Sequence, residues 1–141
     1  MKTWLVDTGP FVAYVDHSDP QHEAVAATLD PFTGQLATTG AVVTEVMSFL
    51  SDVEGGPATF AELLLESETR LVDLTTADEI LAAARLMERY ADTPMDYADA
   101  TLVLLGDELG VTDVLTLDRR GFSTYRTKKG RAFRIVDLAI G

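Results

Sequence analysis

Residues 3–11 read TWLVDTGPF, strand-forming residues that lead into an acid and then a turn. Residues 4–6 form strands readily and are apolar on both sides, which is typical of a parallel sheet covered by helices on both faces. Residues 8–10 then turn the chain, and Pro10 suits the first turn of a helix. Between strand and helix stands Asp7, a carboxylate at the end of a segment that is expected to be buried. The sequence therefore places an acidic side chain at the end of a central strand.

Strands and helices continue to alternate along the chain. Strands are predicted at residues 3–6, 35–39, 70–74, 111–117 and 132–138. Helices are predicted at residues 10–14, 21–29, 41–50, 59–68, 77–91 and 96–110. Such alternation implies a parallel sheet between helical layers. We therefore expect an α/β protein, a three-layer α/β/α sandwich around a central parallel sheet. Because no linker or internal repeat is visible, a single domain over residues 1–141 is predicted.

The composition excludes several classes of protein. With 141 residues, 47% of them hydrophobic, the chain is long and apolar enough to bury a core. It has no cysteine, which excludes disulfides and thiolate metal sites. No apolar run approaches the ~18 residues of a membrane span, and Asp7 interrupts the only candidate for a signal peptide. We therefore expect a soluble, cytoplasmic protein with no membrane partner.

The charge is segregated along the chain. The net charge is −12, which by itself argues against a nucleic-acid partner. Residues 1–118 hold 22 acidic and 4 basic residues, whereas residues 119–134 hold seven basic residues and no acidic one. The basic segment could be a solvated loop and edge strand, or it could contact phosphates beside Asp118, with Phe122 and Tyr125 stacking on single-stranded bases. Its position directly after Asp118 favours phosphate contact.

Two acids follow strands whose ends are expected to meet. Asp7 ends the first strand, and Asp118 comes directly after the fourth. Because ligands of open parallel sheets gather at the carboxyl ends of the strands, both side chains should face one crevice. Each also has a plain alternative, since Asp7 could cap the following helix and Asp118 could start a turn.

Three further acids lie on helices. Glu45 sits at the edge of an apolar face, and Asp99 flanks the apolar stripe of the helix that Asp96 is expected to cap. A helix-terminal role is the alternative for Asp96 and Asp99. Four carboxylates in one crevice would repel and raise one another's pKa. A hard cation such as Mg²⁺, or Mn²⁺ as a substitute, resolves that conflict. Asp7 is therefore predicted to be a metal ligand.

Four motifs carry a resemblance to a known family. In order they are VDTGPF at 6–11, TEV at 44–46, DYADATLVL at 96–104 and LTLDRRGF at 115–122. Together they resemble the PIN-domain ribonucleases, especially the VapC toxins of bacterial type II toxin–antitoxin pairs. The resemblance implies a PIN-like sandwich and a Mg²⁺-dependent endoribonuclease, a hydrolase that leaves 5′-phosphate and 3′-hydroxyl ends. It also implies a homodimer and a small VapB-like antitoxin that blocks the site.

The family's functional residues are carried over position by position. The resemblance places the four acids at Asp7, Glu45, Asp99 and Asp118, and a hydroxyl near the metal at Thr116. Asp7 and Asp99 are the expected main metal ligands, with Asp118 completing the shell and Asp96 as a helper or a cap. The expected contacts to RNA are Thr8, Arg119, Arg126, Lys128, Lys129 and Arg131.

Three alternatives remain at this point. The first is a PIN nuclease that processes RNA without an antitoxin. The second is a phosphoacceptor receiver domain, also a parallel α/β fold with a Mg²⁺-binding acid pocket. Receivers have adjacent acids after the first strand and a phosphorylated Asp after the third, whereas here only Asp7 follows the first strand and Asp73 lies within VDL. The third is a binding module without catalysis, which the intact set of acids disfavours.

Overall fold

The computed structural model describes residues 1–139, so the last two residues of the predicted domain lie outside the described part. The strands are β1 (Thr3–Val6), β2 (Gln35–Thr39), β3 (Arg70–Val72), β4 (Asp113–Leu115) and β5 (Arg134–Ile135). The helices are α1 (Thr8–Val15), α2 (His22–Leu29), α3 (Gly40–Leu50), α4 (Gly56–Glu66), α5 (Ala77–Arg89), α6 (Tyr97–Leu109) and α7 (Arg119–Thr124).

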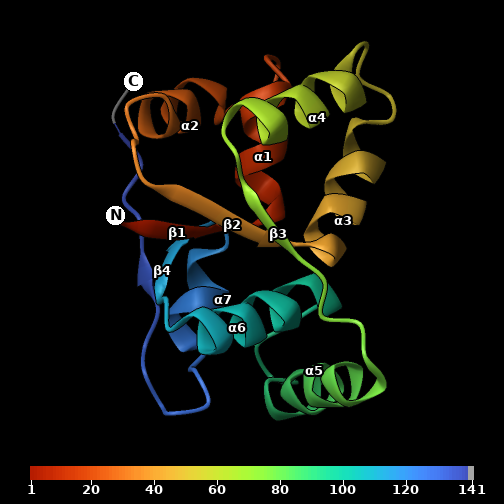
Figure 1. Ribbon diagram of the computed structural model, residues 1–141, viewed down its shortest axis with the longest axis vertical. Helices are drawn as coiled ribbons and strands as arrows, with labels where there is room; N and C mark the ends of the chain where they lie inside the picture. The colour runs from red at the N-terminus through yellow and green to blue at the C-terminus, as the bar shows by residue number, and fades with distance from the viewer. Residues whose placement is uncertain (140–141) are drawn as a thin grey trace.

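The strands form a parallel sheet between two helical layers. Their order is β3-β2-β1-β4-β5, and every pair of neighbours is parallel. Figure 1 shows α1, α2, α3 and α4 on one side of the sheet and α5, α6 and α7 on the other. β1 lies at the centre, where Leu5 is paired with Ala37 of β2 and Val114 of β4. All three side chains are fully buried. The predicted α/β/α sandwich is confirmed.

The strand order also decides one alternative and locates the functional edge. A receiver domain has the order 2-1-3-4-5, with β3 beside β1. Here β3 lies beside β2 at the edge of the sheet and β4 lies beside β1, so the receiver alternative is wrong. From β1 the chain adds β2 and then β3 on one side of the sheet, and it then crosses back to add β4 and β5 on the other side. The crevice at such a switch point lies outside the carboxyl ends of the two adjacent strands, here β1 and β4.

Most helix ends agree with their predicted signals. Thr76 and Glu79 form a reciprocal capping box at the start of α5, and Gly110 ends α6 in the left-handed conformation. Three strands are shorter than predicted: β3 ends at Val72, β4 ends at Leu115 and the edge strand β5 ends at Ile135. Within residues 1–139, no helix is long and apolar enough to cross a membrane.

The helix α7 was not predicted, and it changes the role of two aromatic residues. The basic segment was expected to be loop and edge strand, but Asp118 caps a helix there by accepting the backbone N–H of Gly121 at 3.0 Å. Phe122 and Tyr125 are 0% exposed and pack edge to face with their ring centroids 5.1 Å apart. The prediction that these two rings stack on RNA bases is therefore wrong, because both belong to the core.

Candidate active site

Six carboxylates from five segments line one hollow of about 440 Å³ at the carboxyl ends of β1 and β4. This acid hollow is lined by Asp7, Glu45, Asp96, Asp99 and Asp118 together with Asp19, Thr8, Gly9, Val12, Phe49 and Leu117. A neighbouring hollow of about 460 Å³ shares Asp96, Asp99 and Asp118 and adds Thr93, Pro94, Arg120 and Gly121. The structure thus brings together all five acids that the sequence selected.

Three of these acids are held in place because they cap helices. Asp7 caps α1 by accepting the backbone N–H of Thr8 at 2.8 Å. Asp118 caps α7, and Asp96 caps α6 in a capping box with Asp99. Asp99 accepts the Asp96 N–H at 3.2 Å and donates its own N–H to Asp96 at 2.8 Å. The capping alternative is therefore confirmed for Asp7, and the helix-terminal alternative for Asp96 and Asp99. Asp118, whose alternative was to start a turn, instead caps α7, and these caps hold the carboxylates at the hollow.

Thr116 connects the acids that follow β1 and β4. Its hydroxyl donates to Asp7 Oδ2 at 2.7 Å and accepts the backbone N–H of Asp118 at 2.9 Å. Both oxygens of Asp7 are thereby hydrogen-bonded, since Oδ1 is held by Thr8. Because Thr116 is buried and makes both of these hydrogen bonds, it holds Asp7 and Asp118 in one orientation.

Thr8 performs a similar task on the other side. Its hydroxyl donates to Glu45 Oε1 at 2.7 Å, across a separation of 37 residues. The contact joins the start of α1 to the second turn of α3 and fixes one oxygen of Glu45 at the hollow. Thr8 was predicted to contact RNA, but its hydroxyl is already engaged with a carboxylate.

Burial and like charge make the acids poor proton donors. Burial raises the pKa of Asp7 from 3.8 to about 6, and the charges of Asp96 and Asp118 add to that rise, against the hydrogen bonds from Thr116 and Thr8. Burial likewise raises the pKa of Asp99 to about 8, with Asp7 as the next largest cause. The pKa of Glu45 is also raised, chiefly by burial. Ionising these groups together is unfavourable in the absence of a cation.

The donor set fits a divalent metal ion by its chemistry. Within residues 1–139, no lysine, arginine or histidine forms a salt bridge with any of the five acids. Carboxylate oxygens are the ligands that Mg²⁺ and Mn²⁺ prefer. The side chains are not a ready-made cage, because within the described residues no group of three or more acids or histidines is arranged so that it could hold a metal ion. The fit therefore rests on ligand type and uncompensated charge.

The predicted basic contacts are distributed differently from the acids. Arg119 does not line the hollow and lies 3.8 Å from Asp137, whereas its neighbour Arg120 lines the hollow that adjoins the acids. Arg126 Nη1 donates to the carbonyls of residues 123, 124 and 125 and so fastens the end of α7. Lys128, Lys129 and Arg131 are exposed in the segment that follows.

Several residues of the site were missed by sequence reasoning. Phe49 was assigned to the apolar face of its helix, yet it is 66% exposed and lines the acid hollow one turn after Glu45. Val12 and Leu117 complete this apolar wall. The spacing of four between Glu45 and Phe49 was the available signal, because it places both on one face of a helix. Arg120 and Asp19 carried no signal that distinguished them from other charged surface residues.

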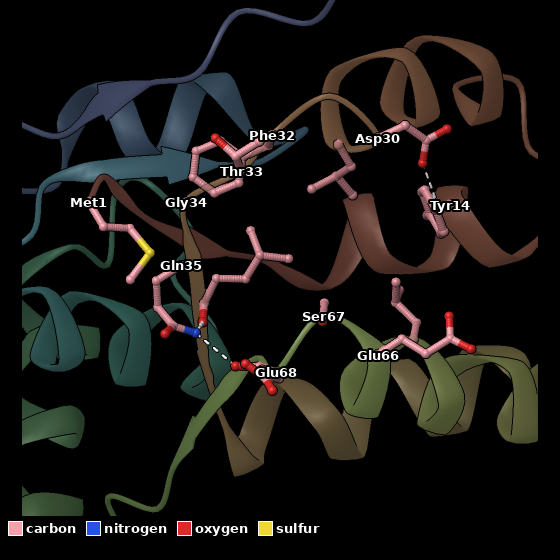
Figure 2. A pocket seen from close by; sticks show the side chains of 13 residues that line it. Met1, Tyr14, Asp30, Phe32, Thr33, Gly34, Gln35, Glu66, Ser67 and Glu68 are labelled. Carbon is pink, nitrogen blue, oxygen red and sulfur yellow. Dashed lines mark hydrogen bonds between the residues drawn. The ribbon is translucent and has the colours of Figure 1, made fainter.

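A second large hollow lies at the opposite end of the sheet. It measures about 480 Å³ and is lined by residues from the amino ends of the strands and from α1, α2 and α4. Figure 2 shows hydrogen bonds between some of its polar groups. Tyr14 donates to Asp30 at 2.6 Å, and the Gln35 amide donates to the carbonyl of Glu68 at 2.8 Å. Three acids line it, Asp30, Glu66 and Glu68, against six in the acid hollow.

Known proteins resemble this chain over most of its length. The PIN domain family model matches residues 4–128. Ribonuclease VapC26 of Mycobacterium tuberculosis is 34% identical over 134 residues, which are 94% of this chain and 98% of the relative. The crystal structure of Mycobacterium tuberculosis VapC20, described as a sarcin-ricin loop cleaving toxin, covers 82% of this chain and 89% of its own with a TM-score of 0.73. Its 20% identity supports the shared fold alone. By the extent of the family match and the identity to a full-length relative, the chain belongs to the PIN domain family.

Proposed function

We propose that the protein is a metal-dependent endoribonuclease and the toxin of a VapBC-type toxin–antitoxin pair. Mg²⁺ is the proposed cofactor, with Mn²⁺ as a substitute, and RNA in the cytoplasm is the proposed substrate. One observation carries the proposal: acids from the ends of two adjacent strands and from two helices converge on one hollow with no basic partner. The relative named Ribonuclease VapC26 supports the nuclease assignment.

Asp7 and Asp99 are the proposed main ligands of the metal, with Asp118 and Asp96 completing the shell. Both main ligands are almost fully buried, at 7% and 8% exposed. When bound, the ion would supply Lewis-acid chemistry, activating a water and neutralising charge on the scissile phosphate. Thr116 holds Asp7 in one orientation through the 2.7 Å hydrogen bond.

Glu45 is proposed to orient the attacking water. Thr8 donates to its Oε1 at 2.7 Å and so fixes the carboxylate at the hollow, where Asp96 lies close enough to help raise the pKa of Glu45. Burial raises the pKa of Glu45 above its ordinary value. Its carboxylate is therefore a stronger base than an exposed one and accepts a proton from water more readily. Phe49 offers an exposed ring at the same hollow, suited to stack on a base next to the cleaved bond.

The proposal is tested by incubating purified protein with mixed structured RNAs in Mg²⁺, in Mn²⁺ and in EDTA. We expect endonucleolytic products with 5′-phosphate ends in either metal and none in EDTA. The Asp99→Asn variant should lose the activity while keeping its circular dichroism spectrum. Cleavage that persists in EDTA, or full activity in Asp99→Asn, would rule the proposal out.

The proposed partners are a VapB-like antitoxin and a second copy of the chain. An acidic hollow without an internal cation suits an arginine from a partner, because a guanidinium pairs with carboxylates through two hydrogen bonds. We expect inhibition by the antitoxin encoded beside the toxin to be lost when that arginine is changed to alanine. Absence of any adjacent antitoxin gene would favour the alternative, a PIN nuclease that processes RNA. Light scattering of the purified protein tests for the homodimer.

A further inference from the structure

A second charged groove lies between α5 and α6, apart from the acids. This α5–α6 groove has a volume of about 440 Å³. Arg85 and Arg89 enter it from α5, and Arg126 and Lys128 enter it from the segment that follows α7. Leu104 of α6 contributes to its apolar floor. All four cations are exposed residues. Segments far apart in the sequence thus bring four positive charges to one groove.

These positive charges are not neutralised by the protein. Within residues 1–139, none of the four cations takes part in a salt bridge. The groove is lined by one acid, Asp107, whose Oδ1 accepts the backbone N–H of Lys128 at 2.7 Å. Arg126 is already anchored, because its Nη1 donates to backbone carbonyls at 2.9 to 3.0 Å. The groove therefore presents a net positive charge that an anionic ligand would neutralise.

The location of these cations is unusual for this chain. Residues 1–118 contain only four basic residues, and two of them, Arg85 and Arg89, line the groove. An RNA strand that approaches the acid hollow is repelled by the carboxylates there until a metal ion is bound. Binding therefore requires cations that act on other phosphates of the same strand.

The groove is connected to the acid hollow through α6 and the residues before it. Asp99 lies in the first turn of α6 and Asp107 lies eight residues later, about 12 Å along the helix axis. The backbone N–H of Arg126 donates to Tyr90 Oη at 3.0 Å, and Tyr125 Oη donates to the carbonyl of Pro94 at 2.8 Å. These bonds fix the Arg126 end of the groove to the loop that contains Pro94. That loop lines the hollow of about 460 Å³ that adjoins the acid hollow. Figure 1 shows α5 next to α6, on the side of α6 that faces away from the sheet.

The other end of the groove is acidic, so the stretch that can attract an anionic ligand ends there. An adjoining hollow of about 380 Å³ shares Leu104 and Lys128 but adds Asp78, Glu79 and Glu108. A polyanion is favoured at the arginine end and disfavoured beyond it. The favourable stretch therefore runs from the loop beside the acids toward Arg85 and ends there.

The geometry points to a phosphate-binding site for the backbone of single-stranded RNA, formed by Arg85, Arg89, Arg126 and Lys128. It would hold nucleotides away from the bond that is cut, and it rests on the proposed ribonuclease function. The guanidinium groups of arginines match phosphate oxygens in geometry and stay charged at all relevant pH values. Because phosphates are contacted and bases are not, the site would strengthen binding to all sequences alike.

The test compares two variants that change the net charge equally. Arg85→Ala/Arg89→Ala removes two cations from the groove, and Lys2→Ala/Arg70→Ala removes two exposed cations at the amino ends of the strands. Affinity for labelled oligouridylates is measured across a salt series, with Ca²⁺ as a non-cleaving ion. The groove variant should bind a long oligouridylate roughly tenfold more weakly, with a log–log salt slope smaller by about 1.4. The control variant should bind as the wild type does.

A short oligouridylate that cannot reach from the acids to the groove should be cleaved at the same rate by both variants. Wild-type affinity and salt slope in the groove variant would overturn the groove site even if the protein cleaves RNA. A protein that binds RNA through the groove but never cleaves it would overturn the proposed function and leave the groove site standing. If the variant loses only dimerisation or antitoxin binding, with RNA affinity unchanged, the ligand is a protein and the inference is wrong.

Discussion

Replacing Asp7 by Asn should stabilise the metal-free protein at high pH. The change keeps the volume of the side chain and removes its charge from a site that is 7% exposed. The pKa of Asp7 rises from 3.8 to about 6 on folding, mainly because of burial. A group whose pKa is raised in the folded state contributes stability that is complete below the unfolded pKa and lost as the pH rises through the folded pKa.

The magnitude follows from that difference in pKa. Each pH unit corresponds to about 1.4 kcal/mol, so ionised Asp7 lowers the free energy of unfolding by up to about 3 kcal/mol above pH 6. The amide of Asn has a single acceptor oxygen for the two donors, Thr8 N–H and Thr116 Oγ1–H, which costs about 1 kcal/mol. The net expectation is a gain of roughly 2 kcal/mol at about pH 8 and a loss of about 1 kcal/mol near pH 4.

Urea unfolding in EDTA at both pH values measures this effect, with Asp52→Asn as a control that removes an exposed charge outside the hollow. Added Mg²⁺ should then stabilise the wild type more than the Asp7→Asn variant, because a ligand stabilises the state that binds it. Equal destabilisation of the variant at both pH values would show that Asp7 acts as a helix cap alone, and equal stabilisation by Mg²⁺ would exclude it as a ligand.

Three further variants test neighbouring parts of the site. Thr116→Val should lower RNA cleavage at least tenfold and the free energy of unfolding by about 1–3 kcal/mol, because it leaves hydrogen-bonding groups unpaired. Thr116→Ser keeps the hydroxyl and should restore both activity and stability. If it does not, the hydroxyl is not the group that matters. Phe49→Ala should leave stability within about 0.5 kcal/mol but weaken RNA binding by about 1–3 kcal/mol. The control Leu65→Ala, at a side chain that is 77% exposed against 66% for Phe49, should change neither, and equal effects of the two would refute a stacking role. Asp99→Asn should reduce cleavage more than Asp96→Asn, and the reverse order would make Asp96 the main ligand.

The sequence predicted the parts of the site that depend on local rules. Asp7 follows a buried strand and precedes a helix, so its place at the edge of the sheet follows from the chain direction alone. Asp118 lies between β4 and α7, three residues after the last residue of the strand. That the two strands are adjacent required the strand order, which sequence periodicity does not contain.

The misses have a common physical cause in tertiary packing. Helix α7 spans only six residues, too few to show an apolar period. Phe122 within it and Tyr125 directly after it are buried because they pack with Phe133 and Tyr90. Phe49 has the apolar side chain of a core residue, yet it is exposed because no helix or strand within residues 1–139 covers it. Whether such an aromatic side chain is buried depends on which helices pack against it in the folded protein.

The central claim is that the carboxylates of the acid hollow hold the ion with which the protein cuts RNA. Its most direct test is a Mn²⁺ titration that follows metal binding by electron paramagnetic resonance and RNA cleavage in the same samples. The wild type should bind Mn²⁺ and begin to cleave with the same midpoint, and Asp7→Asn should lose both while remaining folded. Cleavage by the wild type without bound Mn²⁺, or unchanged binding and cleavage in Asp7→Asn, would contradict the claim.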